Sequence, residues 1–364
     1  MIRNDCVYFK GETPCVYGLL CDNCPRFKPF QTKILIIKRG AMGDVLRTTA
    51  LLPGLKRKYP KSTIFWVVDE DSRELIQDHP DVDRTIPFNL ENILPLFVEK
   101  FDVLFSLDKE EGSTALAEQV ACPLKYGFGL NEHGNLSILN PASEYAYRLG
   151  IDNDLKFFRN QKTYQEIIYD MAELDYQGDP YILHLKEGDR EKARGFFKKH
   201  RISKKRPAVG LNTGSGTRFE TKQWPPRHFS GLIDLLGSKR KADVFLLGGP
   251  KEKALNRSLD EKARARVYNT GNDNSLLEFA GFISLMDVVV SSDSLAMHLA
   301  VALGKRVVAL FGSTCPQEIN FYGRGTKIFA GLPCSPCYKS RCEEMTCMKA
   351  ITAEQVFREI QKIL

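Results

Sequence analysis

Apolar runs and amphipathic stretches alternate along the early part of the chain, and this alternation predicts a βαβ unit. Residues 33–38 form a short β-rich apolar run that ends at a glycine-containing turn, residues 40–44. Residues 45–59 then place apolar side chains at helical spacing, and residues 62–68 and 103–107 predict further buried strands. Because a strand, a glycine turn, a helix and a strand form a βαβ unit, we expect a parallel sheet covered on both faces.

A second series of the same kind follows a polar, helical stretch at residues 151–205. A helix is predicted at residues 295–303, and the strands of this series are predicted at residues 207–212, 243–249, 286–291 and 306–312. Each strand ends in small or polar residues, which is where an open α/β sheet forms its ligand crevice. The sequence therefore predicts an α/β protein of two Rossmann-like, doubly wound domains that face a central cleft.

The length of 364 residues also favours two domains, because one hydrophobic core rarely serves so long a chain. We expect the following division: a cysteine-rich segment at 1–32, the two Rossmann-like domains at 33–185 and 186–345, and a C-terminal helix at 346–364. With 43% hydrophobic and 27% charged residues, the composition is that of a soluble globular protein. Residues 1–6 lack the apolar region of a signal peptide, and no apolar run approaches the roughly 20 residues of a membrane span, so we expect a cytoplasmic protein.

The net charge of +7 narrows the choice of partner only slightly. It suits an anionic substrate or loose attraction to an acidic membrane surface. A nucleic-acid partner is not expected, because no helix-turn-helix, RNA-binding aromatic motif or dense basic stripe is present in the sequence.

The first candidate site is the turn that contains Gly40, Gly43 and Asp44. The two glycines allow a ligand to approach the backbone closely, and the strand-to-helix junction directs free N–H groups into the crevice. Asp44 fits either a helix N-cap or a general base that faces the substrate. The spacing matches neither a Walker A loop nor the Gly-x-Gly-x-x-Gly fingerprint, which disfavours phosphoryl transfer and ordinary dinucleotide binding.

Three further candidate loops follow strands of the second series and are expected to converge on one crevice. Glycines and hydroxyl groups suit phosphate oxygens, and a lysine supplies positive charge. A histidine on a helix is more often structural than catalytic, but His298 follows a strand end that already carries two polar groups. The loops contain Thr213, Gly214, Ser215 and Lys222; Asp293, Ser294 and His298; and Gly312, Ser313 and Thr314.

Several ordered motifs give the chain a family resemblance from about Ile34 to the C-terminus. They are Ile37–Asp44, Pro53–Lys56, Lys222–Pro225, Asp293–His298, Ala302–Gly304 and Ala309–Thr314. In these motifs the chain resembles glycosyltransferase family 9, the ADP-heptose:lipopolysaccharide heptosyltransferases. The resemblance implies a GT-B fold with an N-terminal acceptor domain and a C-terminal nucleotide-sugar domain. It also implies inverting transfer of a sugar, a heptose from ADP-heptose, to a lipopolysaccharide core or related surface glycan, with peripheral contact at the inner face of the membrane.

The resemblance assigns roles to the candidate residues. Asp44 takes the position of the general base, and Gly40, Gly43 and Arg47 belong to the acceptor or phosphate loop. Lys222, with Thr213, Gly214 and Ser215 nearby, takes the place of the pyrophosphate-binding group, and the remaining donor contacts are Asp293, Ser294, His298, Gly312, Ser313 and Thr314. No catalytic metal is expected, because Lys222 and helix N-termini can neutralise the leaving diphosphate.

Leu295 departs from the family pattern. The family commonly has Asp-Thr-Gly where this chain has Asp293-Ser294-Leu295. Because leucine adopts positive φ at a higher cost than glycine, we expect the turn to differ from that of the family. A donor that carries a sugar other than heptose therefore remains an alternative.

Eight of the 10 cysteines fall into two groups near the ends of the chain. In a cytosolic chain such groups indicate a metal or redox site before disulfides. The N-terminal group contains Cys6, Cys15, Cys21 and Cys24, and the C-terminal group contains Cys334, Cys337, Cys342 and Cys347. Each fits a structural zinc site or an iron–sulfur cluster, which spacing does not distinguish. The two groups could also share one site, because the C-terminal helix of a GT-B chain typically crosses back to the first domain.

Two alternatives to a transferase remain at this point. A GT-B sugar-nucleotide 2-epimerase shares the fold but requires further acid/base carboxylates that the sequence does not identify. The second alternative is a non-catalytic nucleotide-sugar or metal-binding module, in which metal binding by the cysteine groups would be the main function.

Overall fold

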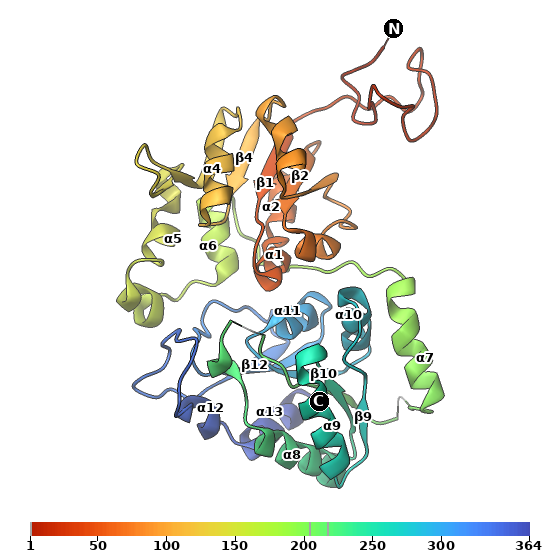
Figure 1. The fold of residues 1–364 in the computed structure, drawn as a ribbon, viewed down its shortest axis with the longest axis vertical. Helices are drawn as coiled ribbons and strands as arrows, with labels where there is room; N and C mark the ends of the chain where they lie inside the picture. Colours follow the sequence, from red (N-terminus) through yellow and green to blue (C-terminus); the bar gives the residue numbers. More distant parts are fainter. Residues whose placement is uncertain (1, 204, 217) are drawn as a thin grey trace.

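Two six-stranded sheets, one in each half of the chain, form the centre of the molecule (Figure 1). The structure is a computed structural model that describes residues 2–203, 205–216 and 218–364. The first sheet contains β1 (Lys33–Ile37), β2 (Thr63–Val68), β3 (Arg84–Pro87), β4 (Val103–Ser106), β5 (Leu124–Leu130) and β6 (Leu136–Ile138). The second contains β7 (Ala208–Asn212), β8 (Asp243–Leu247), β9 (Val267–Asn269), β10 (Val288–Ser292), β11 (Arg306–Phe311) and β12 (Gly325–Phe329).

Both sheets have the doubly wound strand order that the sequence predicts. The order is β3-β2-β1-β4-β5-β6 in the first sheet and β12-β11-β10-β7-β8-β9 in the second. All pairs in the second sheet are parallel, and in the first only β6 runs antiparallel to its neighbour. The order reverses between β1 and β4 and between β7 and β10, so each sheet has one switch point at which a ligand crevice can form.

Helices cover the two sheets and connect their strands. Those of the first half are α1 (Met42–Thr48), α2 (Leu51–Lys58), α3 (Leu90–Ile93), α4 (Glu111–Gln119), α5 (Glu144–Arg148) and α6 (Tyr164–Met171). Those of the second half are α7 (Glu191–Lys199), α8 (Pro226–Leu235), α9 (Lys253–Lys262), α10 (Leu276–Ser284), α11 (Leu295–Ala302), α12 (Thr346–Ala350) and α13 (Ala353–Ile363). Among the described residues, no helix is both long and apolar enough to cross a bilayer.

The helix predicted at residues 45–59 is two helices, α1 and α2. The hydroxyl groups of Thr48 and Thr49 donate to the carbonyls of Asp44 and Leu46, at 2.7 and 2.8 Å. Pro53, in the first turn of α2, has no N–H with which to continue the ladder across the junction. The break therefore follows from residues whose side chains or missing donors compete with helical hydrogen bonding.

The strands that the sequence did not predict lie mainly at or near the sheet edges. β3, β9 and β12 are short and carry exposed or half-exposed side chains, so their sequences lack a continuous apolar run. β5 carries Gly127 with φ of +100°, which interrupts its apolar pattern. The seven strands predicted from apolar runs are interior in the sheets, where both faces are covered.

The two halves meet through α1 and α11, which lie against each other at the junction of the two lobes (Figure 1). One hydrophobic cluster is continuous across this contact and includes Leu46 from α1 and Met297 from α11. The expectation that the C-terminal helix crosses back to the first domain is wrong. α13 packs against α8, and its Val356 and Phe357 belong to the core of the second sheet. The division at residues 32, 185 and 345 stays a prediction.

Candidate active site

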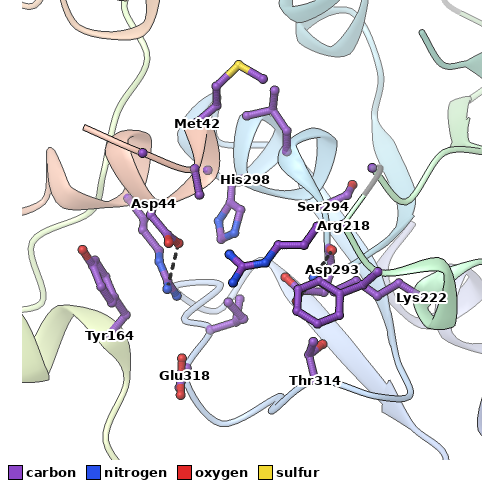
Figure 2. A pocket seen from close by; sticks show the side chains of 18 of the residues that line it. Met42, Asp44, Tyr164, Arg218, Lys222, Asp293, Ser294, His298, Thr314 and Glu318 are labelled. Carbon is purple, nitrogen blue, oxygen red and sulfur yellow. Dashed lines mark hydrogen bonds and ion pairs between the residues drawn. The ribbon is translucent and has the colours of Figure 1, made fainter. Parts of the chain in front are cut away.

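A cleft of about 1130 Å³ lies between the two lobes, at the carboxyl ends of the central strands. Its walls come from the loops that follow β1 and β4 in the first sheet and β7, β10 and β11 in the second. Both switch points thus open into the same cleft, which is the position expected for a ligand site in open α/β sheets. Figure 2 shows the side chains from both halves that point into it.

The loop after β1 is fastened to the loop after β4 by a buried ion pair between Lys38 and Asp108. The Asp108 carboxylate also accepts the backbone N–H of Arg39. Burial acts to lower the pKa of Lys38, but the nearby negative charges, Asp108 foremost among the carboxylates, raise it above its ordinary value. This pair therefore fixes the backbone from which the glycine turn starts.

Asp44 is the third residue of α1, so it is not the N-cap. The N-cap is Ala41, with φ of +46° and no side-chain hydrogen bond. The Asp44 carboxylate lies 2.9 Å from Nη2 of Arg47, and 35% of its side chain is exposed. Burial acts to raise the pKa of Asp44, but the charges of Arg47 and Lys38 outweigh it and hold the pKa below its usual value. Asp44 is consequently an ionised carboxylate that a ligand in the cleft can reach.

Arg47 is itself held in place from the first half. Its guanidinium carbon lies 3.7 Å from the centre of the Tyr164 ring, a cation–π contact. The Tyr164 hydroxyl lies 2.6 Å from Oγ1 of Thr48, which anchors the ring against α1. The arginine therefore keeps a defined position beside Asp44 (Figure 2).

Gly43 lets α1 approach His298 of α11 across the junction of the lobes. A Cβ atom at Gly43 would lie 2.6 Å from Cδ2 of His298, so a side chain at residue 43 would require the imidazole or α1 to shift. His298 is 6% exposed, and its Nδ1 lies 3.2 Å from the hydroxyl of Tyr181. Burial, followed by the charge of Arg47, lowers the pKa of His298 to about 4. His298 is therefore a neutral side chain at neutral pH.

In the second half, Lys222 and Asp293 form an ion pair on the wall of the cleft. Nζ of Lys222 donates to the Asp293 carboxylate at 2.8 Å and to its backbone carbonyl at 3.1 Å. Burial acts to raise the pKa of Asp293, but Lys222 outweighs it and lowers the pKa. Asp44 and Asp293 both line the cleft, so the two carboxylates face the same space.

The neighbouring polar groups of the second half form a hydrogen-bonded network at the switch point. Nδ2 of Asn212 donates to the carbonyl of Gly214 at 2.6 Å and contacts Oγ of Ser294 at 3.2 Å. The Ser215 hydroxyl lies 3.1 Å from Oε1 of Gln223. Gly214, Ser215 and Ser294 all line the cleft.

Three predicted donor-binding residues point away from the cleft. The Thr213 hydroxyl donates to the carbonyl of Leu247 and contacts Asn256 inside the second half. Gly312 is covered by Met348 and Cys347, and the Ser313 hydroxyl is bonded to Thr221. Thr314 does line the cleft, and its Oγ1 has no hydrogen-bond partner among the described residues.

Leu295 does not adopt a positive φ. Leu295 is the first residue of α11, and among the described residues with positive φ none lies between 293 and 295. Leucine is therefore compatible with this turn, and its side chain lines the cleft.

Several cleft residues carried no signal in the sequence. Lys109, Lys156, Arg218, Glu318 and Tyr338 all line the cleft. Burial and the charge of Lys156 lower the pKa of Lys109 to about 8, whereas burial raises the pKa of Glu318. Arg218 extends between His298 and Asp293 (Figure 2). Lys109, Glu318 and Tyr338 lie outside the glycine-containing turns, where sequence spacing gives no indication of direction.

The two cysteine groups lie in different parts of the molecule, so they do not share one site. The N-terminal group lies in the segment above the first lobe, and α12, which contains Cys347, lies in the second lobe (Figure 1). Cys347 is close enough to Cys334 and Cys337 for their charges to act on its pKa, which burial raises. Within the described ranges, no three Cys, His, Asp or Glu side chains converge closely enough to hold one metal ion.

Comparison with known proteins decides the family. The sequence model of glycosyltransferase family 9 (heptosyltransferase) matches residues 96–348, which is more than half of the chain. The chain belongs to glycosyltransferase family 9. Its enzyme class is therefore glycosyltransferase, which decides against the 2-epimerase and the non-catalytic module.

Among curated proteins, the chain is similar to heptosyltransferases of two bacteria. It is 26% identical over 311 residues to lipopolysaccharide heptosyltransferase 1 of Salmonella typhimurium, covering 80% of this chain and 92% of that protein. It is 24% identical over 318 residues to lipooligosaccharide heptosyltransferase 2 of Haemophilus influenzae, covering 78% and 84%.

Among solved structures, the fold is similar to that of family 9 enzymes. The glycosyl transferase family 9 structure from Veillonella parvula has a TM-score of 0.69 at 19% identity and covers 93% of this chain and 98% of that one. The structure of Escherichia coli ADP-heptose lps heptosyltransferase II has a TM-score of 0.66 at 20% identity, covering 91% and 98%. These likenesses confirm the predicted GT-B fold.

Proposed function

We propose that this family 9 glycosyltransferase transfers a heptose from ADP-heptose to a lipopolysaccharide core or a related surface glycan, with inversion at the sugar. The curated relatives are named as lipopolysaccharide and lipooligosaccharide heptosyltransferases. One similar structure, Escherichia coli heptosyltransferase WaaC, was solved with ADP-2-deoxy-2-fluoro heptose. The observation that carries the proposal is that an ionised carboxylate, Asp44, faces the Lys222–Asp293 pair across one cleft.

Asp44 acts as the general base in this proposal. Its carboxylate accepts the proton of an acceptor hydroxyl while that oxygen forms a bond to the anomeric carbon of the donor. The bond between this carbon and the diphosphate oxygen breaks, and ADP leaves with the electron pair. Attack from the face opposite the leaving group inverts the configuration. Arg47 holds the Asp44 carboxylate in position and keeps it ionised.

Lys222 neutralises the diphosphate as it leaves. Its ammonium group lies at the cleft wall, 2.8 Å from the Asp293 carboxylate, and Ser215, Ser294 and Thr314 supply polar groups around it. A positive charge already placed where negative charge develops stabilises the transition state. With Lys222 in this role we propose that the chemistry needs no metal, so transfer survives treatment with EDTA.

We propose that the enzyme acts at the inner face of the cytoplasmic membrane. The support is the net charge of +7, which favours an acidic surface, and the lipid-linked nature of the proposed acceptor. Metal binding by the two cysteine groups, in a structural role, is a separate proposal that the transfer reaction does not require.

The test is a donor and acceptor screen with the full chain. ADP release and product mass are measured with ADP-heptose, ADP-glucose and UDP-N-acetylglucosamine, each with heptose-deficient lipopolysaccharide. We expect ADP release from ADP-heptose that depends on the acceptor, a product heavier by one heptose, and the same rate with EDTA. Acceptor-dependent release from another donor alone would contradict the assignment of the sugar. Loss of activity with EDTA in a protein that remains folded would contradict the metal-free mechanism.

A further inference from the structure

The N-terminal head, which we define as residues 2–32, has very little structure of its own to hold it together. It contains an isolated β-bridge between Cys6 and Pro29, and none of its described residues is buried. Val16 and Leu20 are 68% and 85% exposed. A segment of this size buries too little apolar surface to be stable alone, and such segments usually depend on disulfides or metals.

Four cysteines of the head surround one small cavity of about 30 Å³. Aromatic rings complete its wall, among them Tyr8 and Tyr17 with ring centroids 5.0 Å apart. Arg3 also lines it and adds positive charge. All four thiols are free, and they belong to Cys6, Cys15, Cys21 and Cys24.

The four thiols line one cavity without converging on a single point, which favours a cluster over a single ion. A tetrahedral zinc site draws four sulfurs to about 2.3 Å from one centre. In the described residues no three metal-binding side chains converge in that way. In an iron–sulfur cubane each thiolate binds a different iron atom, so the four sulfurs stand apart around an occupied centre.

Two of the four thiols are brought together by a local turn. The Cys21–Cys24 turn is closed by the N–H of Cys24, which donates to the carbonyl of Cys21 at 3.3 Å. Asn23 in this turn has φ of +53°, which brings the two thiols to the same side of a tight Cys-x-x-Cys turn.

We propose that the head holds a [4Fe–4S] cluster whose ligands are Cys6, Cys15, Cys21 and Cys24. The cluster is structural, because the head lies on the side of the first lobe away from the cleft (Figure 1). Its attachment is through Phe30, whose ring stacks on Phe65 with centroids 6.5 Å apart. This inference rests on the proposal that the head binds metal, and it does not depend on the transfer reaction.

The test uses the full chain, purified without oxygen and reconstituted with ferrous iron and sulfide. Iron, acid-labile sulfide, zinc and the visible spectrum are measured for the wild type and for four variants. Cys6→Ser and Cys24→Ser remove ligands of the head. Cys122→Ser is the matched control outside both groups, and Cys342→Ser reports on the C-terminal group. Sugar transfer and thermal unfolding of the two lobes show whether each variant is folded.

We expect the wild type to hold about four more iron and four more sulfide per chain than either head variant. The broad visible absorption of the wild type should be lost in both head variants. Cys122→Ser and Cys342→Ser should retain this iron. One zinc per chain that is lost in Cys24→Ser would overturn the cluster while leaving metal binding by the head in place. Equal metal contents in the wild type and both head variants would overturn both proposals, whatever the result for sugar transfer.

Discussion

The two switch points of the molecule have the same strand order but opposite electrostatic designs. In the first half, the pair Lys38–Asp108 is almost fully buried in the cleft wall, and the group that is exposed to the cleft is a carboxylate, Asp44. In the second half, the pair Lys222–Asp293 lies at the cleft wall itself, among serine and threonine hydroxyls.

The difference lies in which partner of each pair is available to a ligand. Arg47 and Lys38 hold Asp44 ionised, so the first half offers a proton acceptor. Asp293 instead holds the Lys222 ammonium at the wall, so the second half offers a charge for an anion. The same α/β frame thus supports two chemistries through a few side chains at equivalent strand ends. Substitutions in one half should therefore change one chemistry and spare the other.

The largest effect is expected from Asp44→Asn. The amide keeps the shape of the carboxylate but cannot accept the acceptor's proton, so kcat should fall by about 10²–10⁴-fold. The second half is unchanged, so the Kd for ADP should stay within about threefold of the wild type. Steady-state transfer and calorimetric ADP binding measure the two effects separately.

The matched control is Asp260→Asn, at an exposed residue of α9 outside the cleft. It should leave both quantities unchanged. If Asp44→Asn transfers sugar at the wild-type rate, Asp44 is not the general base, and the proposed division of roles between the two halves is wrong.

The contact between the halves is sensitive to acid through His298. The pKa of this buried side chain is about 4 in the folded protein, against an ordinary value of 6.5. The unfolded chain therefore binds a proton first as the pH falls below about 6.5. The free energy of unfolding should decrease by up to about 3 kcal/mol by pH 4. Urea unfolding at pH 7 and pH 4 measures this loss.

His298→Asn should reduce that loss, because the unfolded chain then gains no proton at residue 298. Burial also lowers the pKa of His79 to about 4. His79→Asn should therefore remove a second part of the loss in the free energy of unfolding, in the same pH range. The exposed His133 supplies the control His133→Asn. An unchanged pH dependence in His298→Asn would show that the contact with Gly43 does not keep the imidazole neutral.

Lys222→Met should weaken the second half selectively. Loss of a charge-assisted contact to the diphosphate should raise the Kd for ADP by about 10–100-fold. In this variant Arg47 and Lys38 still lower the pKa of Asp44, so the pH dependence of kcat should remain that of the wild type. Lys262→Met, at the exposed C-terminal end of α9, is the control. Unchanged ADP affinity in Lys222→Met would remove the anion-binding role from the second half.

The central part of this arrangement could be predicted from the sequence because buried strands leave continuous apolar runs. β1, β7, β10 and β11 were found in this way. Asp293 follows β10 directly, and Asp44 lies in the first turn of the helix after β1. Edge strands such as β12 were missed because one face is exposed and the apolar run is broken. The predicted position of α13 was wrong because it was taken from the family resemblance. The apolar face of the helix, which packs on α8, was not considered.

Side-chain direction accounts for the differences between the predicted and the observed lining of the cleft. Thr213 and Ser313 follow strand ends, as expected of ligand-binding residues, yet their hydroxyls point into the second half. Spacing along the sequence places a residue at a strand end without specifying which way it points. Lys109 and Glu318 were missed for the complementary reason, since they reach the cleft from loops that have no glycine turn.

The smallest effect concerns the sugar, and it tests whether the second half selects the donor. Leu295 lines the cleft from the first residue of α11 and needs no unusual backbone angle, so its side chain can be shortened without disturbing the turn. Leu295→Ala enlarges the space beside Asp293, and the ratio of kcat/KM for ADP-heptose over ADP-glucose should rise by about 3–10-fold. Leu295→Met, which keeps the volume, should leave that ratio unchanged. If the alanine variant keeps the wild-type ratio, the sugar does not contact Leu295, and its selection belongs to other residues of the cleft.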